Sequence, residues 1–120
     1  MITQQTITAT VATGDTGATV DTEIIHGEIL KVSWDVTGAS MDINLDSLGE
    51  QKAQAIIDYT GNTDSTFYPR TIAEKIDGTD YLYVTGEEVP VPFVVYGKLR
   101  LTLASAAAAE TVTMTITYRT

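Results

Sequence analysis

TVTMTITY at residues 111–118 alternates threonine with an apolar residue over eight positions. KLRLTL at residues 98–103 alternates polar with apolar residues just before it. Successive side chains of a strand point to opposite faces, so each stretch predicts a strand with one apolar and one polar face. We expect the two strands to pair antiparallel and to pack their shared apolar face against another sheet.

The same two-residue period begins near the N-terminus. It predicts weakly apolar strands at residues 6–12 and 18–25, with a turn at Gly14–Gly17 between them and with Val20 and Ile24 on one face. We expect these two strands to form an edge hairpin or an arm that reaches onto a neighbour.

A central strand is predicted at residues 28–36, where Leu30, Val32 and Trp34 share one face. Another strand follows at residues 41–46. The pattern Ser47-x-x-Glu50 favours a helical turn, and a strand is then expected at residues 54–59.

Prolines mark the middle of the chain. Pro69 has no N–H, so residues 66–75 predict an edge strand or a bend. A short strand is expected at residues 81–84. Val89-Pro90-Val91-Pro92-Phe93 predicts extended backbone with one side unpaired, and residues 105–110 are expected to cap a hairpin.

About eight to nine strands with turns every ten or so residues predict one all-β domain. We expect residues 1–120 to form an antiparallel β-sandwich of jelly-roll or Greek-key type, with residues 1–12 as an extended N-terminal arm or an edge strand.

The chemistry-bearing residues are few. The chain has no cysteine, one histidine (His26) and a net charge of −9. The seven cations are scattered, which disfavours nucleic acid and anionic membrane as partners. Asp42-x-Asn44-x-Asp46 resembles the start of a calcium loop, but Ser47 and Ala53 stand where that loop needs glycine and an acid. We expect no catalytic, cofactor or metal site and no enzyme activity.

Three parts of the chain together resemble small virion proteins of tailed bacteriophages. These are Phe67-Tyr68-Pro69-Arg70, the stretch VVYGKLRL at residues 94–101, and the closing strand at residues 111–118. The resemblance runs from Gln5 to Arg119. It implies a capsid decoration (cement) protein, often a homotrimer, which is made in the host cytoplasm and binds the major capsid protein on the virion surface.

An oligomer or capsid interface is expected where the chain offers surface beyond its core. The candidates lie in the N-terminal segment, at one arginine able to pair with a carboxylate, and in the proline-marked segment. They are Ile2, Ile7, Ala9, Arg70, Val89, Pro90, Val91, Pro92 and Phe93.

Two alternatives stay open. One is a head-tail connector or tail accessory protein. The other is a carbohydrate-binding or receptor-binding module, which Trp34, Tyr81 and Tyr83 favour because aromatic rings stack on sugars.

Overall fold

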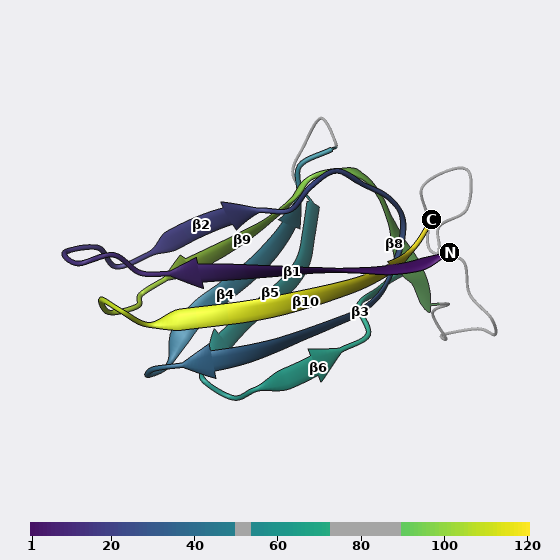
Figure 1. The fold of residues 1–120 in the computed structure, drawn as a ribbon. Coiled ribbons are helices and arrows are strands. Elements are labelled where there is room, and N and C mark those ends of the chain that lie inside the picture. Colours follow the sequence, from purple (N-terminus) through teal and green to yellow (C-terminus); the bar gives the residue numbers. More distant parts are fainter. Residues whose placement is uncertain (50–53, 73–89) are drawn as a thin grey trace.

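The computed structural model describes residues 1–49, 54–72 and 90–120, which form ten β-strands and no helix. The strands make two antiparallel sheets packed face to face (Figure 1). The prediction of an all-β antiparallel sandwich is therefore confirmed. None of the described residues belongs to a helix long and apolar enough to span a bilayer.

The first sheet has six strands in the order β1-β10-β3-β8-β7, with β6 also paired to β3. Its strands are β1 (Ile2–Thr10), β3 (Ile25–Thr37), β6 (Ser65–Phe67), β7 (Arg70–Ile72), β8 (Pro90–Gly97) and β10 (Thr111–Arg119). The long strand β3 is central, because β10 lies along one side of it while β8 and β6 share the other.

The second sheet has four strands in the order β2-β9-β4-β5. They are β2 (Ala18–Asp21), β4 (Met41–Ser47), β5 (Gln54–Gly61) and β9 (Leu99–Ala104). In both sheets, strands from the beginning of the chain alternate with strands from its end, as in a jelly roll. This interleaving places β1 and β10 side by side although they lie at opposite ends of the sequence (Figure 1).

The strands β9 and β10 do not form the pair that their patterns suggested. β9 lies in the second sheet and β10 in the first, so the prediction of a hairpin capped by residues 105–110 was wrong. The connection crosses between the sheets with Ser105 and Ala109 at positive φ, 53° and 68°. The apolar rows of both strands still belong to one core.

The two N-terminal strands are also divided between the sheets. β1 pairs with β10 and β2 pairs with β9, so the prediction that these two strands form an edge hairpin was wrong. Residues 2–10 do occupy an edge of the first sheet. Ile24 does not continue the inner face of β2. It is 59% exposed, because β2 ends at Asp21 and the next residues carry the chain across to β3.

A β-bulge changes the phase of β3. Thr117 lies opposite Lys31, but the next residue, Tyr118, lies opposite Ile29, so Leu30 has no partner position on β10. One extra residue in a strand reverses which side chains face inward. Val32 and Trp34 are therefore buried as expected, whereas Ile29 takes the core position and Leu30 is half-buried.

The middle of the chain agrees with several local predictions. Pro69 lies in the bend between β6 and β7, and strands form at residues 41–47 and 54–61 as expected. Ser47 ends β4, while Glu50 of the expected helical turn lies outside the described residues. The predicted strand at residues 81–84 and the candidate Val89 also lie outside them.

Candidate interaction surface

The alternation of β1 divides the N-terminal candidates between two faces. Ala9 is buried in the core and Ile7 packs against that core, so neither is available to a partner. Ile2 lies on the other face and is 61% exposed. Of the three residues, Ile2 is the one that the structure leaves on the surface.

The same division holds in β8. Phe93 is buried in the core, and Val91 shares its inward face because the two are separated by one residue. Pro90 and Pro92 alternate with them and face outward. Arg70 of β7 lies opposite Pro92, so its side chain belongs to the same outer face.

Outward side chains of β3 and β8 form a surface of aromatic and aliphatic residues that we call the outer patch, made of His26, Pro92, Val94 and Tyr96. Val94 and Tyr96 are 67% and 68% exposed. His26 lies directly opposite Tyr96, and the two rings stack with centroids 4.1 Å apart and planes 14° from parallel. Exposed apolar residues that adjoin one another are a mark of interaction sites on soluble proteins.

Charged side chains border the outer patch. Glu28 lies opposite Val94 on one side and Arg119 on the other, and its carboxylate is 3.7 Å from the Arg119 guanidinium. Arg119 in turn lies opposite the exposed Ile2. A polar rim around an apolar centre is the usual arrangement of a protein–protein interface.

Sequence reasoning did not select Val94, Tyr96 or His26 as contact residues. A signal was present, because residues 93–96 read Phe-Val-Val-Tyr in one strand. Two of four consecutive apolar residues must face away from a core that lies on one side of the strand. The stack of His26 on Tyr96 had no such signal, because it depends on the pairing of β3 with β8.

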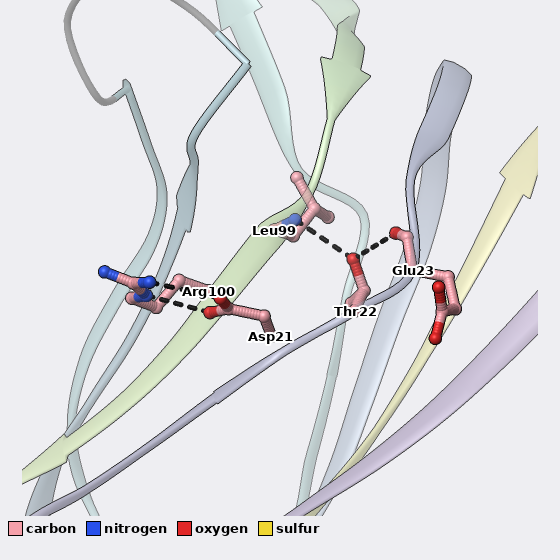
Figure 2. A network of polar contacts seen from close by, with 5 residues as sticks. All are labelled: Asp21, Thr22, Glu23, Leu99 and Arg100. Carbon is pink, nitrogen blue, oxygen red and sulfur yellow. Dashed lines mark hydrogen bonds and ion pairs between the residues drawn. The ribbon is translucent and has the colours of Figure 1, made fainter.

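The outer face of the second sheet has a different character. It carries four aspartates and one arginine at outward positions, namely Asp21, Asp42, Asp46, Asp58 and Arg100. Figure 2 shows Arg100 donating two hydrogen bonds to the Asp21 carboxylate, at 2.8 and 3.1 Å. These bonds lower the pKa of the Asp21 carboxyl below its ordinary value. In the described part of the chain, no three histidine, aspartate or glutamate side chains gather closely enough to hold a metal ion.

The residues that resembled a calcium loop lie on this acidic face. Asp42 accepts a hydrogen bond from Thr60 at 2.8 Å across the β4–β5 pair. Asn44 and Asp46 alternate with the buried Ile43 and Leu45. Asp42, Asn44 and Asp46 are therefore the polar side of the alternating strand β4, which accounts for their spacing.

An aromatic cluster lies between β5, an edge strand of the second sheet, and β6, which pairs with β3 of the first sheet. Phe67 stacks on Trp34 with ring centroids 4.8 Å apart, and Tyr59 meets Trp34 at 5.3 Å. Trp34 is buried and its Nε1 has no hydrogen-bond partner, while Phe67 is 40% exposed. A cleft of about 240 Å³ adjoins the cluster, lined by Ile56, Ile57, Asp58, Tyr59, Phe67 and Pro69.

Trp34 cannot act as a sugar platform from this position, because its ring lies beneath Phe67 and Tyr59. Tyr81 and Tyr83 lie outside the described residues. No protein-family model matches the chain, and a search of curated proteins finds no similar sequence.

Proposed function

We propose that this protein is a structural component of a virion, a capsid decoration protein that binds the outer shell and stabilises it. The observation that carries the proposal is the outer patch, an exposed aromatic and aliphatic surface on one face of a sandwich. The resemblance of residues 5–119 to small bacteriophage virion proteins supplies the partner, the major capsid protein.

The physical character of the outer patch supports a protein partner. Covering Val94 and Tyr96 removes apolar surface from water, at about 25 cal/mol for each Å². The stacked rings of His26 and Tyr96 are held by the β3–β8 pair before any partner arrives. A surface ordered in advance loses little conformational entropy on binding. The net charge of −9 makes a polyanion such as DNA a poor competitor for this face.

Binding to empty shells assembled from the major capsid protein tests the proposal. Wild-type protein should sediment with the shells, and the variant Val94→Ser/Tyr96→Ser should lose at least roughly tenfold in affinity, since central aromatic residues carry much of the binding energy of an interface. The matched control is Thr19→Ser/Thr102→Ser on the outer face of the second sheet, which should bind like wild type.

The copy number on purified virions provides a second test. A decoration protein should be present in numbers comparable to the major capsid protein. A few copies near the tail vertex would contradict decoration and favour a head-tail connector or tail accessory protein.

A second candidate function is binding of a carbohydrate in the cleft between β5 and β6. It is favoured by the partly exposed rings of Tyr59 and Phe67, which line the cleft and offer apolar faces to a sugar. A saccharide bound there should change the fluorescence of Trp34, the one tryptophan of the chain, which contacts both rings. No response of this fluorescence and no signal on a glycan array would remove the candidate.

A further inference from the structure

The strand β1 has unused hydrogen-bonding groups along one side. Among the described strands, β10 is its one pairing partner. At the two ends of this pair, the carbonyl of Met1 accepts from the N–H of Thr120 at 3.0 Å and the N–H of Val11 donates to Glu110 at 2.9 Å. In an antiparallel pair such bonds recur at every second residue, so the odd-numbered residues of β1 bond to β10.

The even-numbered residues of β1 therefore direct their N–H and C=O groups to the open side of the sheet. These residues are Ile2, Gln4, Thr6, Thr8 and Thr10, and all five are exposed. A row of free donors and acceptors on an edge strand is a template for a further strand.

The other edge strands among the described residues carry features that oppose such pairing, whereas β1 has none. β2 has four residues and ends at the charged Asp21, and β5 carries Asp58 and a register shift opposite β4. β6 and β7 have three residues each. β1 has nine residues, without charge or proline, and its register with β10 is unbroken from Ile2 to Thr10. Charge, proline, shortness and bulges are the means by which proteins protect an edge strand.

We propose that β1 pairs with β1 of a second copy of this chain, antiparallel, with Thr6 opposite Thr6 about a two-fold axis. This register places Gln4 opposite Thr8 and Ile2 opposite Thr10, so every residue with free backbone groups meets another such residue. Five residues on each copy then exchange about ten backbone hydrogen bonds. The two six-stranded sheets become one continuous sheet.

The side chains of β1 favour a second copy as the partner. β1 contains no charged residue, so this contact brings no like charges together. Two chains of net charge −9 repel one another, and an uncharged strand is therefore a favourable place for them to meet. The contacts between β1 and β10 show the chemistry that the new pair would repeat. Thr6 and Thr115 hydroxyls are 3.0 Å apart, and Gln4 donates to Thr117 at 3.2 Å.

A two-fold contact joins copies in pairs, which differs from the homotrimer that the resemblance implies. The inference does not depend on the proposed virion function, because the purified protein alone tests it. Failure of shell binding and failure of self-association are thus separate results.

Amide hydrogen exchange of the full chain, measured at low and high protein concentration, tests the pairing directly. The amides of Gln4, Thr6 and Thr8 should become more protected as concentration rises, whereas those of Gln5 and Ile7, which already bond to β10, should not change. Analytical ultracentrifugation should give twice the chain mass at high concentration. A monomer or a trimer at every concentration, or amides of Gln4, Thr6 and Thr8 that exchange freely at a concentration where the chain is dimeric, would overturn the proposal.

Substitution at the centre of the contact provides a second test. Thr6→Pro removes an N–H that points to the open side and leaves the β1–β10 bonds in place, so dimerisation should weaken at least roughly tenfold. If Thr6→Pro does not fold, Thr6→Lys/Thr8→Lys should give the same loss by charge repulsion. The matched control is Thr115→Lys, directly opposite Thr6 on the same face but one strand from the edge, and it should still dimerise. Dimers of Thr6→Lys/Thr8→Lys with wild-type stability would contradict the proposed register.

Discussion

The hydroxyl of Thr22 accepts a hydrogen bond from the backbone N–H of Leu99 at 3.0 Å, although the two residues are 77 positions apart. The same hydroxyl donates to the Glu23 carbonyl at 2.7 Å, and the Thr22 N–H donates to the Leu99 carbonyl at 2.9 Å. Thr22 is buried, and Figure 2 shows its contacts where the chain leaves β2 for β3. Thr22 thus extends the β2–β9 pairing into the crossing between the sheets.

Thr22→Val should destabilise the protein by about 1–3 kcal/mol, because the buried Leu99 N–H loses its acceptor while the side-chain volume is kept. Urea denaturation followed by circular dichroism measures the change in unfolding free energy. Thr22→Ser keeps the hydroxyl and should cost clearly less. A larger loss in Thr22→Ser than in Thr22→Val would show that methyl packing, and not the hydrogen bond, holds this crossing.

Met114→Ala should destabilise the protein by about 2–5 kcal/mol, since it opens a cavity in the core. Met114 is fully buried in β10, whereas its neighbour Thr113 faces outward, where its hydroxyl lies 3.2 Å from that of Thr8. Thr113→Ala should change the unfolding free energy by no more than about 0.5 kcal/mol. Thermal unfolding of both variants measures the contrast, and similar losses would contradict the assignment of the two faces.

Gly27→Ala should be among the most damaging small substitutions, costing about 3 kcal/mol or more. Gly27 has φ of +147°, and a β-carbon there would overlap the Arg119 carbonyl oxygen, which is backbone of the neighbouring strand. Gly14 also has positive φ, +88°, but a β-carbon would meet nothing within 4 Å.

Gly14→Ala is therefore the matched control, with an expected cost of roughly 1 kcal/mol from backbone strain alone. Chemical denaturation of the two variants separates strain from collision. If the two substitutions cost the same, the close approach of β3 and β10 at Gly27 does not limit stability.

The sequence was sufficient to predict which faces of most strands are buried, because alternation is a local property of each strand. Met114, Val32 and Trp34 all lie in the core on this basis. Which strands are neighbours is not local. β9 and β10 have matching patterns and a short connection, yet they lie in opposite sheets, because Ser105 and Ala109 adopt positive φ and redirect the chain. Neither residue type signals such a turn.

The bulge in β3 shows a second limit of the sequence pattern. Ile29 and Leu30 are both apolar, so alternation alone does not say which of them faces the core. The choice is made by the register with β10, where Tyr118 lies opposite Ile29. The candidate contact residues divide in the same way, since Pro92 and Phe93 are adjacent in sequence but lie on opposite faces of β8.

The pair of Asp21 and Arg100 should give stability that depends on pH. Arg100 lowers the pKa of Asp21 in the folded protein, mainly through its hydrogen bonds to the carboxylate. A carboxyl whose pKa is lower when folded contributes stability above its unfolded pKa of about 4, and this contribution disappears as pH falls through the folded pKa. Asp21→Asn should therefore be slightly less stable than wild type at pH 7 and equally stable in strong acid.

A double-mutant cycle with Arg100→Gln isolates this contribution from other effects of the two substitutions. The coupling energy should be small, because both side chains are partly exposed, and it should shrink further in high salt. Asp15→Asn, in the exposed turn after β1, is the control for loss of a negative charge. A coupling that persists in strong acid would contradict an ion-pair origin, because a protonated Asp21 has no charge with which to hold Arg100.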